Sequence, residues 1–303
     1  RSTPLYSSAA SDVYKRQVEN ALGRYYLYFA DHKGNSIRLA YADEIVGPWT
    51  IHAPGALQIA DSHFATEAPE VRWLELQALR IGAWWRGIQV THGLQRELTL
   101  PHIASPDVHV DHEKKRFVMY FHGLEGFARQ ATRVATSPDG LAFQARPEIL
   151  GQTYFRAFEY GDETYALAMP GQFYRGATPL SGFEEGPLLF EPDMRHNALL
   201  MRGDPLHVFW RRLGDAPEVL LRSASDLSGP WEAWSATKSV EVLRPERDWE
   251  GADVPAAPSI RSVAPGRVNQ LRDPAIFEED GRVYLLYAIA GESGIALAEL
   301  HAR

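Results

Sequence analysis

Apolar and polar positions alternate along the chain in short runs of strand length, joined by charged or glycine-containing turns. In LRDPAIFEEDGRVYLLY, residues 271–287, a polar residue opens an apolar strand, a turn follows, and an aromatic-rich strand begins. Asp273 precedes Tyr284 by eleven positions in this segment. The same interval separates three further pairs of residues: His196 and His207, Tyr154 and Tyr165, and Asp107 and Val118. The pattern predicts four β-hairpins in one register.

Further strand-like runs follow each hairpin, and GRYYLYFADHKGNSIRLAYADEIVGPW supplies the later strands of a fifth unit. The phrases VGPWT at 46–50 and SGPWE at 228–232 fall at the same place in the first and fourth units. Hairpins repeated at a regular interval cannot each bury their own faces, so we expect sheets stacked around an axis. The sequence therefore predicts an all-β fold, a five-bladed β-propeller with four-stranded antiparallel blades around a central channel.

Two segments depart from this pattern. Residues 1–17 lack strand periodicity and the apolar run of a secretory signal. Their part SSAASDVYKRQ resembles a translated library linker, so we interpret 1–17 as a non-native leader and expect the first inner strand to be missing or replaced; the alternative is a genuine disordered tail. Residues 67–100 fit neither a period of two nor one of 3.6, which predicts an irregular insertion, either a loop with an embedded helix or a shifted reading frame. Residues 18–303 otherwise predict a single domain.

Composition narrows the function classes. At 45% hydrophobic and 11% aromatic, the 303 residues are enough to bury a large core. The net charge of -8 and the pI near 5.8 provide no basic stripe for nucleic acid. No run of about 18 apolar residues predicts a membrane span. The absence of cysteine excludes disulfides, thiolate zinc sites and cysteine nucleophiles, although it does not fix the compartment.

Propeller geometry brings the starts of the inner strands, the loops after the second strands and the connections between blades to one face. The predicted first residues of the inner strands are Asp107, Tyr154, His196 and Asp273, with neighbours Arg156, Arg195 and Arg272. The loops add His32, Lys33, His122, Arg211 and Glu292, and the connection DWEGADVP adds Trp249 and Glu250. One channel mouth is thus expected to collect acids, cations, imidazoles and aromatic rings.

This mixture suits a sugar, because carboxyl groups handle protons, Arg and His bind hydroxyls or an acidic group, and rings stack on pyranose faces. Glycoside hydrolysis needs two carboxyl groups flanking the scissile bond, and Asp107 with Asp273 is the best predicted pair. Each residue also has a structural interpretation. The two Asp side chains can cap turns, His196 can be a buried imidazole with its hydrogen bonds satisfied, and Arg272 can pair with a carboxylate across the channel.

The RDP and SPDV contexts of the two Asp residues, the five hairpins, and the phrases RYYLYFADHKG and IRLAYADEIVGPWT resemble the five-bladed propeller glycosidases. These are the glycoside hydrolase family 43-like arabinanases and β-xylosidases, with invertases and levansucrases as relatives. The arabinanase type implies an Asp base in blade one, an orienting Asp in blade two and a Glu acid in blade three. Asp107 matches the second by place, the base has no match, and blade three carries Tyr154.

In the invertase type, the RDP motif carries an Asp that stabilises the transition state, and Arg272 with Asp273 matches that motif. Neither set is complete, so Glu250 or Glu292 is expected to supply the missing acid. No cofactor is expected. The resemblance leaves room for a structural calcium ion in the channel, since some arabinanases hold one near a His, although no compact cluster of oxygen ligands is visible in the sequence.

These observations predict a glycoside hydrolase that acts on an oligosaccharide or polysaccharide by carboxylate acid/base catalysis at the channel mouth. Two alternatives stay open. A glycoside phosphorylase is favoured if several Arg and His side chains converge on one anion, and a non-catalytic carbohydrate-binding propeller is the other, because fold does not dictate function. The expected partner is a carbohydrate, with neither nucleic acid nor membrane involved, and the sequence does not determine the oligomeric state.

Overall fold

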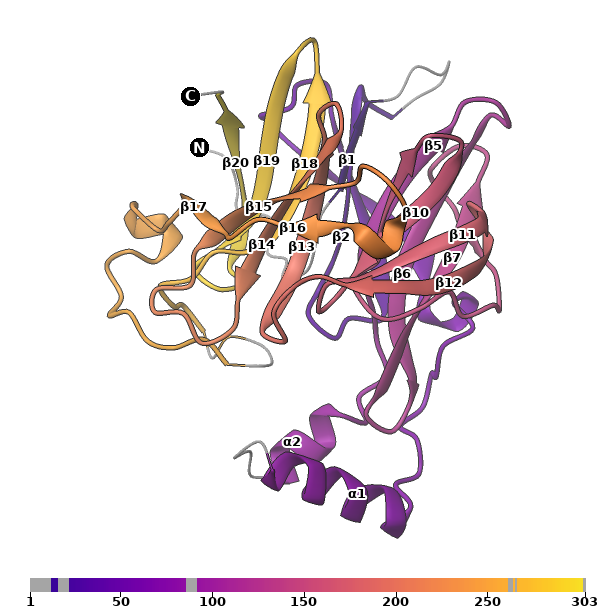
Figure 1. The fold of residues 1–303 in the computed structure, drawn as a ribbon, viewed down its shortest axis with the longest axis vertical. Coiled ribbons are helices and arrows are strands. Elements are labelled where there is room, and N and C mark those ends of the chain that lie inside the picture. Colours follow the sequence, from indigo (N-terminus) through magenta and orange to yellow (C-terminus); the bar gives the residue numbers. More distant parts are fainter. Residues whose placement is uncertain (1–11, 16–21, 86–91, 261–263, 265, 302–303) are drawn as a thin grey trace.

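The computed structural model describes residues 12–15, 22–85, 92–260, 264 and 266–301. Its strands form five small antiparallel sheets, the blades, each built from strands consecutive in the chain (Figure 1). Blade one contains β1 (Asp12–Lys15), β2 (Tyr25–Ala30), β3 (Ser36–Ala42) and β4 (Thr50–Gln58). Blade two contains β5 (Ile103–Asp111), β6 (Arg116–Gly126), β7 (Arg129–Ser137) and β8 (Gln144–Ala145).

The remaining three blades follow the same order from the innermost strand outward. Blade three contains β9 (Arg156–Tyr160), β10 (Glu163–Ala168), β11 (Gln172–Thr178) and β12 (Ser181–Leu188). Blade four contains β13 (Met194–Met201), β14 (Pro205–Arg212), β15 (Leu220–Asp226) and β16 (Ser235–Ala236), and β17 (Val240–Leu243) also pairs with β15. Blade five contains β18 (Arg272–Glu279), β19 (Arg282–Ile289) and β20 (Gly294–Leu300), so within the described residues it has three strands where four were predicted.

Apolar side chains between neighbouring blades close the ring. Strand β2, YYLYFA, is buried along its whole length because both of its faces pack against other blades. Each of the five junctions between successive blades contains an apolar cluster, represented here by one residue from either side: Tyr28 with Phe121, Tyr120 with Phe155, Phe173 with Trp210, Phe209 with Val283, and Phe277 with Leu27. The last pair connects blade five back to blade one. The predicted five-bladed propeller is therefore confirmed.

The innermost position of blade one is filled by β1, whose backbone pairs with Tyr25–Tyr28 of β2. Residues 12–15, part of the segment that resembles a linker, thus occupy the place of the first inner strand. The rest of residues 1–17 lies outside the described residues.

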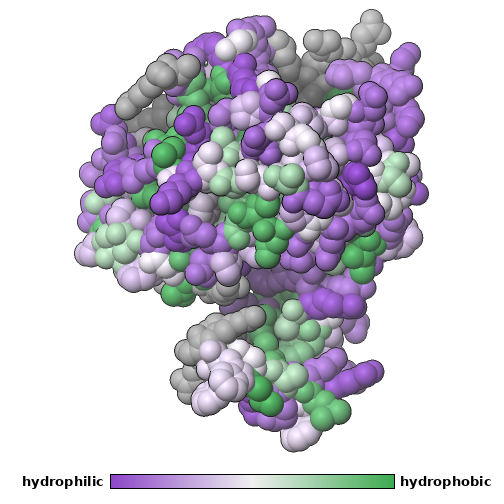
Figure 2. Space-filling model, viewed as in Figure 1, coloured by the Kyte–Doolittle hydropathy of each residue, from purple (hydrophilic) through white to green (hydrophobic). Residues whose placement is uncertain are grey.

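A helical insertion separates blades one and two. It follows the short 3-10 helix η1 (Ile59–Asp61) and contains α1 (Trp73–Trp84) and α2 (His92–Glu97), which project from the propeller body (Figure 1). Large apolar side chains on α1, among them Trp73 and Trp84, are exposed, and the projection shows apolar surface in Figure 2. Two further 3-10 helices, η2 (Trp231–Ala233) and η3 (Asp248–Glu250), lie in the connections of blade four. In the part of the chain that the structure describes, no helix combines the length and apolarity needed to cross a bilayer.

Candidate functional site

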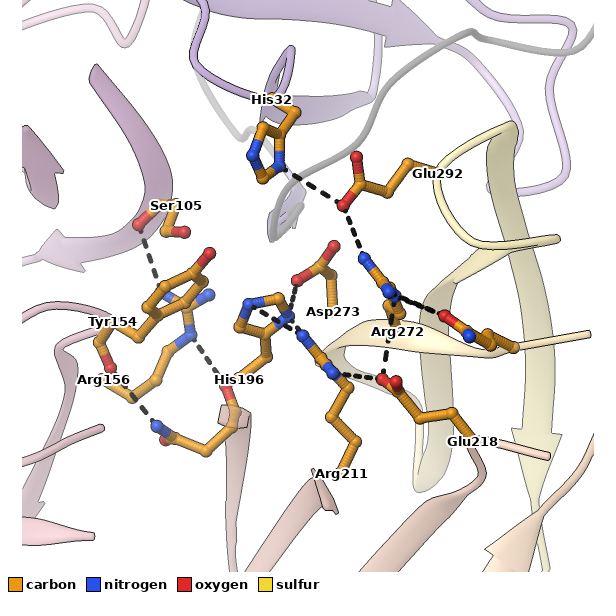
Figure 3. Close-up of polar contacts among 12 residues, drawn as sticks. His32, Ser105, Tyr154, Arg156, His196, Arg211, Glu218, Arg272, Asp273 and Glu292 are labelled. Atoms are coloured by element: carbon orange, nitrogen blue, oxygen red, sulfur yellow. Dashed lines mark hydrogen bonds and ion pairs between the residues drawn. The ribbon is translucent and has the colours of Figure 1, made fainter. Parts of the chain in front are cut away.

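Four inner-strand residues share an unusual backbone conformation at the start of their blades. Ser105, Tyr154, His196 and Asp273 have φ angles of 53°, 58°, 37° and 48°, in the left-handed region that non-glycine residues rarely adopt. Three of them lie at register shifts in the pairing of inner and second strands, and Tyr154 lies just before β9. Their side chains gather around the channel (Figure 3). Each such conformation costs about 1–3 kcal/mol and clusters at functional sites.

The predicted place of Asp107 in this set is wrong by two residues. In blades three, four and five, the eleven-residue interval ends at a second-strand residue. This residue pairs with Phe158, Leu200 or Phe277, each of which lies four positions beyond the left-handed residue of its blade. In blade two, Val118 pairs with His109, which is four positions beyond Ser105 and two beyond Asp107. The hairpin of blade two is longer, so a count from its second strand selects the wrong residue. Ser105 occupies the position equivalent to Asp273.

Asp107 is buried in a different environment. Its carboxylate accepts a hydrogen bond from the backbone N–H of Ala157 at 2.8 Å and contacts Nε2 of His109 at 2.9 Å. Burial acts to raise the pKa of Asp107, but the charges of His109 and Arg156 and these hydrogen bonds outweigh it and lower the pKa overall. Asp107, His109 and Arg156 line a small cavity of about 220 Å³ that lies further along the inner strands. The structure therefore does not bring Asp107 and Asp273 together at one cavity mouth.

A larger cavity, of about 510 Å³, opens at the starts of the inner strands and is called the large cavity below. Eight predicted site residues line it: His32, Lys33, His122, Tyr154, Arg195, His196, Arg211 and Glu292. Sequence reasoning missed others, including Glu97, His102, Arg129, Gln130 and Thr153. His102 directly precedes β5, so the same signal of a polar residue opening an apolar strand was present there. Glu97 belongs to the helical insertion, for which no register was available.

Three aromatic side chains form a stack along one wall of the large cavity. The ring centroids of His122 and Tyr154 are 4.7 Å apart, and those of Tyr154 and His196 are 4.2 Å apart. Burial, together with neighbouring positive charges, holds the pKa of both His122 and His196 well below the usual value, so both are neutral at pH 7. Burial and the nearby Asp273 carboxyl raise the pKa of Tyr154 to about 12.

Asp273 is almost completely buried, and its Oδ1 contacts Nδ1 of His196. Burial raises the pKa of Asp273, although Arg211 and Arg272 act in the opposite direction. Nδ1 of His196 also accepts a hydrogen bond from Nε of Arg211 at 3.2 Å. The pKa of His196 is lowered and that of Asp273 is raised, and both shifts favour the neutral form of the side chain.

A network of buried ions supports this wall of the large cavity (Figure 3). Glu218, with no exposed surface, contacts Arg211 and lies 3.7 Å from Nε of Arg272. Arg272 also donates to Glu292 at 2.9 Å, and Glu292 lies 3.3 Å from Nδ1 of His32. Gln270 accepts two further hydrogen bonds from Arg272. Arg272 was predicted to contact substrate or to pair with a carboxylate across the channel, and it pairs with carboxylates.

Six predicted residues are not among those that line the large cavity: Asp107, Asp273 and Arg272, described above, and Glu250, Trp249 and Arg156. Glu250 is buried in η3, where it accepts hydrogen bonds from the backbone N–H groups of 246 and 247 and from the hydroxyl of Tyr287. Trp249 is exposed on the same short helix. Arg156 donates to backbone carbonyls of Ser105 and Asn197, so its buried guanidinium links neighbouring inner strands. The hydrogen bonds of Glu250 and Arg156 explain the positions of these two side chains without a ligand.

The calcium ion for which the resemblance leaves room finds no cluster of side-chain ligands among the described residues. No group of three or more His, Asp or Glu side chains within these ranges is arranged to hold a metal ion. The carboxylates nearest the channel are instead committed to Arg and His partners, as for Glu218 and Glu292.

Comparison with known proteins places the chain in a family. No protein-family model matches it. Uncharacterized protein R118 of Acanthamoeba polyphaga mimivirus is 32% identical over 308 residues, which cover 94% of this chain and 80% of that protein. The chain belongs to the family of protein R118. This relationship assigns the R118 family a five-bladed propeller, but it carries no activity with it.

Solved structures resemble the fold at low sequence identity. An α-L-arabinofuranosidase from Lactobacillus brevis matches with a TM-score of 0.64 and 11% identity over 98% of this chain and 91% of that one. CoXyl43, a GH43 β-xylosidase/α-arabinofuranosidase from a compost microbial metagenome, matches with a TM-score of 0.58 and 13% identity over 99% and 94%. An exo-β-1,3-galactanase from Phanerochaete chrysosporium matches with a TM-score of 0.56 and 11% identity over 97%, and the chain spans 61% of its length. The R118-family chain thus shares the fold of GH43 glycosidases, as the resemblance in sequence predicted.

Proposed function

We propose that the protein is a glycoside hydrolase that cleaves its substrate in the large cavity, with Asp273 as the proton donor and Glu292 as the second carboxyl group. The observation that carries this proposal is the contact of Asp273, whose pKa is raised, with a neutral His196 beside the large cavity. Figure 3 shows the carboxyl group of Asp273 between His196 and Glu292, both of which line that cavity.

The two carboxyl groups have different surroundings, as the acid and the base of a hydrolase require. Burial raises the pKa of Asp273 and so favours its protonated form, which gives its proton to the leaving-group oxygen as the glycosidic C–O bond breaks. Glu292 contacts the guanidinium of Arg272 at 2.9 Å and lies 3.3 Å from the imidazole of His32. It accepts the proton of the water that adds to the anomeric carbon. The aromatic stack of His122, Tyr154 and His196 offers ring faces to the sugar.

Turnover of a panel of aryl glycosides and oligosaccharides tests the assignment. We expect Asp273→Asn and Glu292→Gln each to lower turnover by about a hundredfold or more, because a positioned acid or base contributes on the order of 10²–10⁴. Glu278→Gln is the matched control, since Glu278 lies on the same inner strand as Asp273 but pairs with Arg202 at the surface. Unchanged rates in both active-site variants overturn the proposal.

The predicted catalytic role of Asp107 is tested by the same assay. If Asp107→Asn abolishes turnover while Asp273→Asn does not, catalysis belongs to the small cavity. A protein that binds oligosaccharides but turns over none of the panel is a carbohydrate-binding propeller, and the hydrolase proposal fails.

A further inference from the structure

Four cationic side chains line the large cavity in a chain whose net charge is -8. Its ionic lining consists of the cations Lys33, Arg129, Arg195 and Arg211 and the anions Glu97 and Glu292. Arg211 pairs with Glu218, and Arg129 lies 3.9 Å from Glu125, whereas the hydrolysis proposed above gives no role to Lys33 and Arg195. A cavity that concentrates one sign of charge selects ligands of the opposite sign.

The cations act on one another within the large cavity. Burial lowers the pKa of Lys33, Glu97 opposes this effect, and the charge of Arg195 adds a smaller lowering. Lys33 also lowers the pKa of His102 and of His122. Lys33 follows β2 in blade one and Arg195 belongs to β13 in blade four, so the propeller brings them together from distant segments. A bound anion offsets the repulsion between Lys33 and Arg195 and the loss of hydration of Lys33.

His122 supplies a second and independent observation. Its side chain is 3% exposed, it lines the large cavity, and its Nδ1 has no hydrogen-bond partner among the described residues. A buried polar atom left without a partner costs about 1–3 kcal/mol, so such atoms generally serve a ligand or a water. Because His122 is neutral, one of its ring nitrogens carries a hydrogen and donates.

We propose that Lys33, Arg195 and His122 form a binding site for a phosphate group in the large cavity. A phosphate dianion has several acceptor oxygens, and the site offers an ammonium, a guanidinium fork and an imidazole from three different blades. The volume of about 510 Å³ lies within the range of small-molecule sites and has room for a sugar ring as well.

The phosphate has two chemical sources, and the choice between them rests on the proposed glycosidic cleavage. In the first, inorganic phosphate replaces water: its oxygen forms a bond to the anomeric carbon, the glycosidic C–O bond breaks, and the leaving oxygen takes the proton of Asp273. The product is a sugar 1-phosphate. In the second, the phosphate is a monoester on the substrate, and it positions a sugar that water then cleaves.

Binding is measured first, without turnover, so that its outcome is independent of the hydrolase proposal. Calorimetric titrations with inorganic phosphate and with glucose 1-phosphate are made at constant ionic strength on the full chain and on Asp273→Asn. We expect saturable binding to both proteins, weakened about tenfold or more in Lys33→Met and in Arg195→Met, since each loses a charge-assisted contact. Lys33→Arg keeps the charge and should restore binding.

Arg202→Met is the control for charge alone, because Arg202 pairs with Glu278 at the surface. Its phosphate affinity should equal that of the parent protein, and thermal melts of every variant verify that it is folded. The proposal is overturned if the parent protein shows no saturable binding of either compound. It is also overturned if binding persists unchanged in folded Lys33→Met and Arg195→Met, even where aryl glycosides are hydrolysed.

Product analysis then distinguishes the two sources. Formation of sugar 1-phosphate that depends on added phosphate supports the acceptor role. Tighter binding of glucose 1-phosphate than of inorganic phosphate, with turnover indifferent to added phosphate, supports the substrate monoester.

Discussion

Replacing Glu218 with glutamine removes the shared negative charge of the ion network behind the large cavity. Glu218 has no exposed surface and faces Arg211 and Arg272, both of which are themselves about 1–2% exposed. Glutamine has nearly the same shape, so the change leaves packing intact and leaves two guanidinium groups buried beside a neutral amide. Arg272 keeps Glu292 as a partner, whereas Arg211 loses its carboxylate.

Breaking a buried ion pair by neutralising one partner typically costs about 3–5 kcal/mol. At roughly 2.1 cal/mol/K per residue, the 303 residues give an unfolding entropy of about 0.6 kcal/mol/K. Dividing the first figure by the second predicts a fall in Tm of about 5–8 °C.

Thermal unfolding followed by circular dichroism measures the effect, and Glu241→Gln provides the comparison. Glu241 forms a two-hydrogen-bond pair with Arg244 at the surface, and exposed pairs contribute about 0–1 kcal/mol, so its Tm should fall by less than about 2 °C. If the two variants melt at the same temperature, Glu218 does not hold the buried arginines and the network does not support the cavity wall.

Asp273→Asn should be at least as stable as the parent at pH 7. The pKa of Asp273 is raised in the folded protein, so its ionisation above the ordinary carboxyl range costs the parent stability. The advantage of the variant should therefore shrink in melts toward pH 4. A lower Tm at pH 7 contradicts the burial argument. Burial and the charge of Lys33 lower the pKa of His102 to about 4. As pH drops from 7 to 4, the His102 side chain binds a proton in the unfolded chain before it does so in the folded protein. The free energy of unfolding should therefore fall by up to about 3 kcal/mol over this range. Urea titrations should show a smaller loss in His102→Gln, and equal slopes refute the assignment. Gly123→Ala places a Cβ 2.5 Å from the ring of Phe64 and should cost about 1–3 kcal/mol in melts, whereas Gly126→Ala, with nothing within 4 Å, should cost far less.

The repeated hairpins were sufficient to predict the propeller, because each blade repeats the same local pattern of apolar positions. The eleven-residue interval predicted the position of Tyr154, His196 and Asp273 correctly, since their hairpins have closely similar lengths. It failed for Asp107 because the longer strands of blade two move the left-handed position to Ser105. A period counted along the sequence does not reveal such a change in length.

The large cavity could be predicted only as far as its residues belong to the repeat. Loop residues such as His32 and Glu292 were found because propeller topology assigns second-strand loops to the same face. Glu218 was not found, since it precedes a third strand in a segment, DAPEVLL, without a distinguishing pattern. Its role depends on two arginines from other strands, which only the folded chain brings into contact.

The left-handed residues at the start of four inner strands also indicate how ligand preference can change within this protein family. Three of these positions sit at bulges, where one residue drops out of the regular ladder of backbone pairing. Ser, Tyr, His and Asp occupy the four equivalent positions, so the propeller accommodates an alcohol, a phenol, an imidazole and a carboxylic acid at this position of the inner strand. New ligand preferences can therefore arise by exchanging one side chain at a time around the axis, while the blades that carry them remain unaltered.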